Sequence, residues 1–223
     1  MAKACSSKLY VLSVIEANPE FEALAPQVVE KAEKETHDYL EAIKAEVERL
    51  TRLVEGIEDL AKAEASFFSP GEYVRINLKE FLEGIVLGMG PIFRENGLSF
   101  SLSERGDLEV VTDVDKLDMI MKNLLSNSLK FTKEGGVRIE YGSNDSYFFV
   151  VLRDTGQGIP EDEIPKIFTR FFRGTGAGDK GAGIGLALVK ELITVMGGRI
   201  AVTSTPGEGS TFTLWLPMRG HAH

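Results

Sequence analysis

The sequence has little of several features that would define its class at once. It contains one cysteine, Cys5, among 223 residues, which excludes an internal disulfide framework and suits a reducing compartment. Its best apolar stretch, 84–93, is shorter than the ~20 residues of a membrane helix and contains Pro91. The first ten residues lack the apolar core of a signal peptide. We therefore expect a cytoplasmic chain, or the cytosolic portion of a larger sensor protein, without membrane contact in this segment.

Basic residues are also in short supply. The chain has 34 acidic and 25 basic side chains and a net charge of −9. Such an acidic balance argues against broad electrostatic binding to nucleic acid. A hydrophobic content of 43% is ordinary for a globular protein and excludes disorder throughout.

Most of the acidic excess lies in residues 20–65, which hold 13 acidic and 6 basic side chains. Apolar residues recur there at alternating spacings of three and four, the pattern of a helix with a narrow apolar seam. The seam consists of Leu40, Ile43, Val47, Leu50, Val54, Ile57 and Ala61. A shorter apolar segment precedes it and ends at Asn18-Pro19. We predict that residues 1–69 form a helical hairpin that dimerises as a four-helix bundle.

The pattern changes after Ser69-Pro70-Gly71, and residues 70–219 are predicted to form a second domain. Helices are expected at 78–93, 115–131 and 184–196. Strands are expected at 73–76, 98–102, 108–111, 137–141, 147–153, 199–204 and 211–216. Because the strands come in hairpins and the helices in separate runs, we predict an α+β fold. It would be a two-layer α/β sandwich, with helices on one face of a mixed or antiparallel sheet.

Glycine is concentrated near the third of these helices. Ten of the 23 glycines fall between Gly174 and Gly209. Glycine permits close backbone approach, and a helix N-terminus offers unpaired N–H groups at a positive dipole end. The region is therefore either a phosphate site or a mobile surface loop. The P-loop motif is absent, and the G-x-G-x-x-G match at Gly176 lacks the strand–turn–helix context of a dinucleotide site.

The predicted helix 115–131 carries a second group of polar residues. Asn123, Asn127 and Lys130 stand at i, i+4 and i+7, hence on one face. Asparagine is a poor helix former, so two of them within a helix require an explanation. An amide oxygen is a suitable ligand for Mg²⁺, and a lysine can meet a phosphate. The alternative is a solvated polar face.

A third group follows the apolar strand that ends near Arg153. Asp154 is followed by Gly156 and Gly158, a combination that is usually only a turn. A carboxylate at this place can, however, accept a hydrogen bond from an exocyclic amine. The two glycines would then let a planar ring lie against the backbone.

Together these segments resemble the sequence boxes of the catalytic domain of sensor histidine kinases, a branch of the Bergerat-fold (GHKL) ATPases. The boxes occur in order as N (123–132), G1 (154–159), F (167–173), G2 (181–190) and G3 (207–212). The resemblance spans about residues 70–217, and the acidic seam resembles the second helix of the family's dimerisation hairpin.

The resemblance implies ATP and Mg²⁺ as cofactors. It implies that Asp154 binds the adenine amine and Asn127 ligates Mg²⁺, while Asn123, Lys130 and Arg173 act on the phosphates. Residues 169–180 would form a lid. The full set of nucleotide-binding residues implied in this way is Asn123, Asn127, Lys130, Phe131, Asp154, Gly156, Gly158, Ile159, Phe168, Lys180, Gly181, Gly183, Ile184, Gly185, Leu186 and Thr211.

The family transfers the γ-phosphoryl group to a histidine in the first hairpin helix and then to an aspartate of a response-regulator receiver domain. Counted back from the seam, that acceptor falls near Ser7, where this sequence has no histidine. His37-Asp38 resembles another acceptor pattern, but it lies in the acidic helix. His221 and His223 read as tail residues. Phosphorylation of the chain on its own acceptor is therefore not expected.

Two functions follow from this departure. The first is a histidine kinase core whose acceptor histidine is replaced near Ser7 or absent from this chain. The second is a pseudokinase that binds nucleotide and regulates through its helical dimer. A serine kinase or chaperone ATPase of the same fold fits less well, because the F box and the acidic hairpin point to histidine kinases.

Overall fold

The computed structural model of the chain describes residues 30–31, 34–47, 50–51, 72–103, 106–174 and 183–218. Two compact units are present, residues 1–54 and residues 55–223. The predicted boundary between residues 69 and 70 lies outside the described residues, as do most of the predicted hairpin and several predicted site positions. Those positions are Ser7, Lys180 and Gly181; the tail residues His221 and His223 also lie outside the described residues.

In the first unit, residues 34–47 are helical, as the apolar spacing predicts. The seam is open to solvent: Leu40 is 57% exposed, Ile43 53% and Val47 55%. Large apolar side chains aligned on one stripe of a helix normally pack against another surface. The arrangement of this unit as a dimeric bundle stays a prediction.

The second unit contains all of the strands and helices predicted for it, with bounds that differ by at most two residues. In chain order they are β1 (Tyr73–Asn77), α4 (Leu78–Glu95), β2 (Ser99–Leu102), β3 (Glu109–Asp113), α5 (Val114–Phe131), β4 (Gly136–Ser143), β5 (Tyr147–Asp154), α6 (Gly185–Val195), β6 (Arg199–Thr205) and β7 (Gly209–Pro217).

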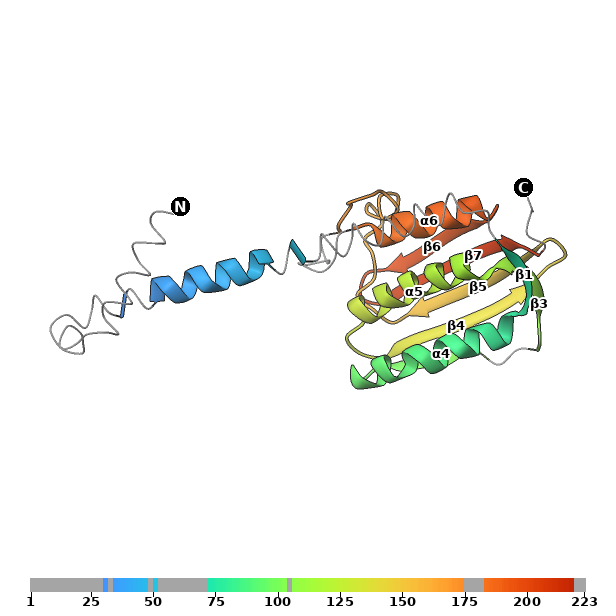
Figure 1. The fold of residues 1–223 in the computed structure, drawn as a ribbon, viewed down its shortest axis with the longest axis horizontal. Helices are drawn as coiled ribbons and strands as arrows, with labels where there is room; N and C mark the ends of the chain where they lie inside the picture. The colour runs from blue at the N-terminus through green and yellow to red at the C-terminus, as the bar shows by residue number, and fades with distance from the viewer. Residues whose placement is uncertain are drawn as a thin grey trace. The chain divides into compact units, whose positions relative to one another are not determined.

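These elements form two layers. Five strands pair in the order β2-β4-β5-β7-β6, and β1 and β3 form a separate two-stranded sheet. β2 and β4 are parallel, while the other pairs of the large sheet are antiparallel. Helices α4, α5 and α6 lie over one face of this sheet (Figure 1). The predicted two-layer α/β sandwich with a mixed sheet is therefore confirmed.

The core lies between the two layers. Alternate residues of β5, Phe148, Val150 and Leu152, are fully buried, as expected for a strand with one face on the core. Leu117 and Ile120 of α5 pack into the same cluster. Burying each such side chain contributes roughly 1.5–3 kcal/mol, and this anchors α5 and β5, the two elements that carry most of the predicted site.

Helices α4, α5 and α6 differ in whether a side chain caps their first backbone N–H groups. Asn77 caps α4 by accepting from the backbone N–H groups of Lys79 and Glu80. Asp113 caps α5 by accepting from the backbone N–H group of Lys116. Helix α6 has neither a side-chain cap nor an acidic residue in its first turn.

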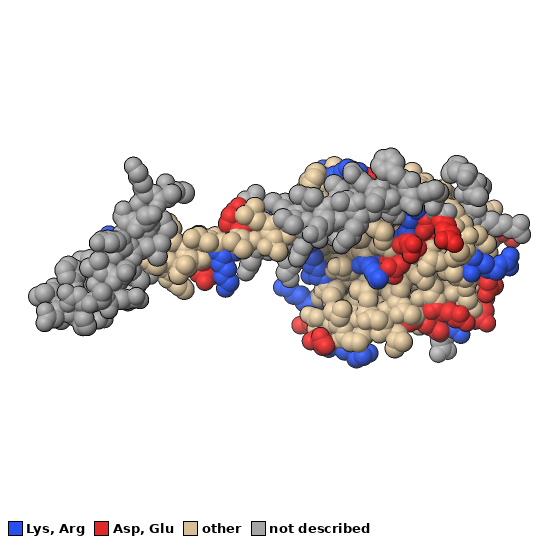
Figure 2. Space-filling model, viewed as in Figure 1, with Lys and Arg blue, Asp and Glu red and all other residues tan. Residues whose placement is uncertain are grey.

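Acidic and basic side chains are interspersed over the face of the second unit seen in Figure 2. In the part of the chain that the structure describes, no helix combines the length and apolar character needed to cross a membrane.

Candidate functional site

Asp154 is the last residue of β5, and only 6% of it is exposed. The pairing of β5 with β7 places Asp154 opposite Ser210. One carboxylate oxygen, Oδ1, accepts hydrogen bonds from the backbone N–H groups of Gly156 at 2.9 Å and Ser210 at 3.1 Å. The other oxygen, Oδ2, has one long contact, 3.5 Å, from the hydroxyl of Ser128 on α5.

Burial raises the pKa of Asp154, and the hydrogen bonds from Gly156, Ser210 and Ser128 oppose that shift only in part. A carboxylate oxygen has room for about two hydrogen bonds. Oδ2 is therefore the oxygen with spare acceptor capacity, and it suits a donor such as an exocyclic amine.

The loop after Asp154 requires its glycines. A Cβ at Gly156 would lie 2.7 Å from the carbonyl oxygen of Phe131, and a Cβ at Gly158 would lie 2.2 Å from that of Thr205. Gly158 also has a φ of +72°. The N–H of Gln157 donates to the same Phe131 carbonyl at 3.1 Å. The G1 loop is thus held against the C-terminus of α5.

A second polar group lies where α5 meets the start of α6. The side-chain amide of Asn123 donates to the carbonyl of Met119 at 3.0 Å. Its oxygen is directed elsewhere: a Cβ at Gly185 would lie 2.8 Å from Asn123 Oδ1. Gly185 is the first residue of α6, whose N-terminal N–H groups have no side-chain cap. Uncapped N–H groups and the positive end of a helix dipole favour an anion.

The F-box segment is fixed to the same helix. Arg170 makes two hydrogen bonds with Glu191 of α6, at 2.9 and 2.8 Å. The N–H of Phe171 donates to the Gly183 carbonyl at 2.9 Å. Phe171 has a φ of +65° and Gly183 one of +72°. A non-glycine residue in this region costs about 1–3 kcal/mol and is often found at functional sites.

Asn127 is the residue that could contribute to a Mg²⁺ site shared with a bound ligand. Asn127 is half-buried and makes no side-chain hydrogen bond to the described residues. Among those residues, no three His, Cys, Asp or Glu side chains form a cluster that could hold a metal by themselves. A cation at Asn127 would therefore take its other ligands from phosphate oxygens and water, as Mg²⁺ commonly does.

Lys130, the third polar residue of this helix face, has its ammonium 5.0 Å from the Phe131 ring centroid.

The other predicted residues divide into three sets. Ile184 is buried, whereas Ile159, Phe168 and Leu186 are half-buried against the core. Arg173 is exposed. Lys180 and Gly181 are outside the described residues.

Thr211 is not brought to Asp154. It pairs with Arg153, and Ser210 pairs with Asp154. Because side chains alternate along a strand, the Thr211 side chain lies on the opposite face of the sheet from Asp154. Ser210 supplies the backbone contact instead.

The sequence interpretation gave no role to Ser210, Ser128 or Thr132. Ser128 follows Asn127 directly, so its place in the N box was the available signal. Side chains alternate between the two faces of a strand, so once Asp154 is paired with β7, this alternation identifies Ser210 as the residue on the same face. Thr132 is buried next to Gly156, a contact that only the three-dimensional structure reveals.

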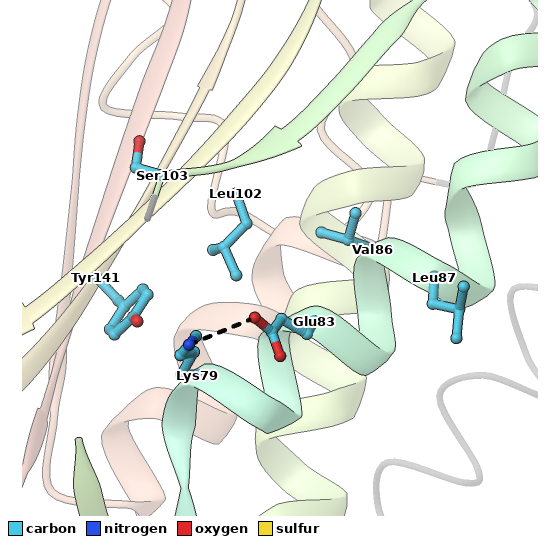
Figure 3. A pocket seen from close by; sticks show the side chains of 7 residues that line it. All are labelled: Lys79, Glu83, Val86, Leu87, Leu102, Ser103 and Tyr141. Carbon is cyan, nitrogen blue, oxygen red and sulfur yellow. Dashed lines mark ion pairs between the residues drawn. The ribbon is translucent and has the colours of Figure 1, made fainter. Parts of the chain in front are cut away.

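The structure also has a hollow of about 360 Å³ between α4 and the edge of the large sheet. Figure 3 shows its lining, in which Lys79 and Glu83 face each other at 3.9 Å beside Leu102 and Tyr141. This hollow shares no residue with the Asp154 and Asn123 groups, so it is separate from the predicted site.

Comparison with known proteins identifies the class. Residues 112–220 match the family of histidine kinase-, DNA gyrase B-, and HSP90-like ATPases. The chain is 33% identical to the sensor histidine kinase RcsC of Escherichia coli (strain K12) over 181 residues, 77% of this chain. It is 31% identical to the sensor histidine kinase WalK of Bacillus subtilis (strain 168) over 190 residues, 81% of this chain.

Solved structures agree. Full-length ShkA in complex with AMPPNP matches with a TM-score of 0.66 and 26% identity, over 85% of this chain and 40% of that one. The catalytic domain of the histidine kinase ThkA matches with a TM-score of 0.59 and 25% identity, over 66% of this chain and 99% of that one.

The second unit therefore contains an ATPase domain of this family, and the chain is similar in sequence and fold to sensor histidine kinases. It spans only 18% of RcsC and 30% of WalK.

Proposed function

We propose that the chain is the ATP-binding core of a two-component sensor histidine kinase, located in the cytoplasm. The observation that carries this proposal is the way α5 connects the two polar groups. Asn123 contacts the start of α6, and Phe131 contacts the G1 loop beside Asp154. Eight residues of helix separate these contacts, about 12 Å at ~1.5 Å per residue. That length is comparable to an extended adenosine triphosphate.

In this proposal the base lies at Asp154. The spare oxygen of its carboxylate accepts from the adenine amine, and Gly156 and Gly158 allow the ring to approach the backbone. The two backbone N–H groups on Oδ1 hold the carboxylate in place. Guanine presents a carbonyl where adenine has its amine, so a carboxylate at this position disfavours guanine.

The phosphates then extend toward Asn123 and the N-terminus of α6. Asn127 would hold Mg²⁺, which neutralises phosphate charge when bound. Asn123, Lys130 and Arg173 would orient the triphosphate and stabilise the charge that develops on the transferred γ-phosphoryl group. The chain's contribution is positioning and electrostatic stabilisation for in-line transfer.

The chain has no histidine at the position where the family carries its phosphoryl acceptor. Ser7 stands where an acceptor histidine is expected, and an imidazole is a better nucleophile at neutral pH than a serine hydroxyl. We therefore propose transfer to a histidine supplied by another chain, and from there to an aspartate of a response-regulator receiver domain. The second candidate, a nucleotide-binding pseudokinase, is favoured by the same absence.

The exposed seam of Leu40, Ile43, Val47 and Leu50 supports a homodimer through the helical unit. An Ile43→Glu, Val47→Glu variant should be monomeric in sedimentation equilibrium, while Glu41→Gln, Glu46→Gln should leave the dimer intact. A wild-type chain that is monomeric at micromolar concentration would contradict this part of the proposal.

The deciding experiment uses labelled ATP and Mg²⁺. The wild-type chain and a Ser7→His variant are each incubated alone and with a partner chain that carries an intact acceptor helix. Label on the restored or supplied histidine, and none on the wild-type chain alone, supports a kinase that lacks its acceptor. Tight ATP binding without label on any acceptor supports the pseudokinase instead.

A further inference from the structure

Within the described part of the chain, the Thr132 hydroxyl is the one buried side-chain polar atom without a hydrogen-bond partner. Thr132 is the C-cap residue of α5 and is 5% exposed. Valine has nearly the same shape and would fill this space without burying an unpaired donor. On packing grounds alone, a hydroxyl is therefore the less stable choice here, which points to a role outside folding.

The hydroxyl lies beside the carboxylate that is proposed to bind the base. A Cβ at Gly156 would lie 3.0 Å from Thr132 Oγ1 and 2.8 Å from Asp154 Oδ1. The hydroxyl and the carboxylate thus flank the same glycine. Thr132 is also tied to Ser128, since its N–H donates to the Ser128 carbonyl at 3.0 Å. Two neighbouring hydroxyls at the end of α5 therefore face Asp154 and its loop.

The two carboxylate oxygens have unequal support. Oδ1 accepts two backbone N–H groups, whereas Oδ2 has only the 3.5 Å contact from Ser128. A donor placed close by would hold the carboxylate in one orientation while an amine approaches the spare oxygen. The Thr132 hydroxyl is placed to become that donor, because its Oγ1 and Asp154 Oδ1 lie 3.0 and 2.8 Å from the same point beside Gly156 and its proton can rotate about the C–O bond.

We propose that Thr132 is a positioning residue for Asp154: when the base is bound, its hydroxyl donates to the Asp154 carboxylate and fixes the orientation that accepts the adenine amine. This inference rests on the proposed function, because it requires an adenine nucleotide at Asp154. It adds a residue that acts through the carboxylate and has no contact with the phosphates.

The test compares Thr132→Val, which keeps the shape and removes the donor, with Thr132→Ser, which keeps the donor. Thr213→Val, a half-buried exchange of the same kind on β7, is the matched control. Affinities for adenosine and for ADP with Mg²⁺ are measured by calorimetry, and Tm by circular dichroism. For Thr132→Val we expect about tenfold weaker binding of both ligands, with Tm unchanged or higher. Thr132→Ser and Thr213→Val should stay within about twofold of wild type.

A double-mutant cycle separates positioning from packing. In an Asp154→Asn background, Thr132→Val should cause no further loss of affinity, because the carboxylate that it positions is gone. Equal losses of affinity and of Tm in Thr132→Val and Thr132→Ser would show a packing role and overturn the inference.

The inference and the proposed function fail in different ways. If Asp154→Asn weakens ADP binding but Thr132→Val binds like wild type, the inference is overturned and the proposed function stands. If wild type does not bind ADP, or if Asp154→Asn binds as tightly as wild type, both are overturned.

Discussion

The two ends of the proposed nucleotide site differ in how much of their geometry exists in the protein alone. At the base end, Asp154 is buried and its Oδ1 is held by two backbone N–H groups. At the phosphate end, Asn123 and Asn127 are half-buried, and α6 begins without a side-chain cap. The base end is thus preorganised for one shape and one hydrogen-bond donor. The phosphate end offers the side chain of Asn127, the amide oxygen of Asn123 and the uncapped N–H groups of α6, which a phosphate group with its Mg²⁺ would pair.

This difference assigns the selection of the base to the Asp154 end and the handling of the phosphates to the α6 end. A buried carboxylate on a rigid strand discriminates between bases, because an incorrect partner leaves it unpaired. A helix terminus and two amides attract phosphate of many kinds with little selection. The variants below separate the two ends by comparing adenosine, which lacks phosphates, with ADP and ATP.

The largest effect is expected from Asp154→Asn. The amide keeps an oxygen for the backbone N–H groups but presents a donor to the adenine amine. Loss of a charge-assisted hydrogen bond predicts about 10- to 100-fold weaker binding of adenosine, ADP and ATP alike. Calorimetry measures this. Asp107→Asn, which removes the same charge from an exposed position, is the control. A loss confined to ATP would mean that Asp154 lies at the phosphate end.

Asn127→Ala should weaken ADP binding about tenfold in the presence of Mg²⁺ and leave adenosine binding unchanged. With EDTA in place of Mg²⁺, wild type and variant should bind ADP equally. Ser126→Ala, one residue earlier and exposed, controls for changes in α5. An equal loss with and without the metal would remove Asn127 from the metal site.

Gly185→Ala places a Cβ 2.8 Å from Asn123 Oδ1 and narrows the phosphate end. We expect about fivefold weaker ATP binding with unchanged adenosine binding, as measured by fluorescence competition. Gly84→Ala on α4 is the matched control because its Cβ meets nothing within 4 Å. Gly84→Ala should leave binding intact and stabilise the fold by about 0.5–1 kcal/mol. Weakened adenosine binding in Gly185→Ala would contradict the division into two ends.

The pH dependence of adenosine binding should be set by the ionisation of Asp154. The pKa of Asp154 is raised above the ordinary carboxyl value of 3.8, chiefly by burial. Adenine requires the ionised form, so adenosine affinity is full above this raised pKa and falls as the pH drops through it.

The pH dependence of folding stability has the opposite sign. Burial favours the protonated form of Asp154, so this group stabilises the fold at low pH, and that contribution is lost as the pH rises through its pKa. Titrations between pH 4 and 8, in steps of about half a unit, test this, and Asp154→Asn should abolish the dependence.

Much of the second unit follows from its sequence. The apolar residues Leu117, Ile120 and Leu124 recur at a helical spacing, and the short apolar run Phe148–Leu152, rich in aromatic and β-branched residues, is typical of a buried strand. The order of the glycine boxes also indicated which residues would meet. Contacts that depend on register could not be predicted. The resemblance implies Thr211, whereas the pairing of β5 with β7 places Ser210 opposite Asp154, and burial of the Thr132 hydroxyl depends on how closely Gly156 approaches α5.

The central claim is that Asp154, Asn127 and the start of α6 share one nucleotide. A crystal structure of the chain with a non-hydrolysable ATP analogue and Mg²⁺ tests it most directly. The account predicts the adenine amine at Asp154 Oδ2, the metal at Asn127 and the phosphates beside Asn123 and Gly185. An analogue bound elsewhere, such as in the hollow beside Tyr141, or bound with its base at α6 and its phosphates at Asp154, would contradict it.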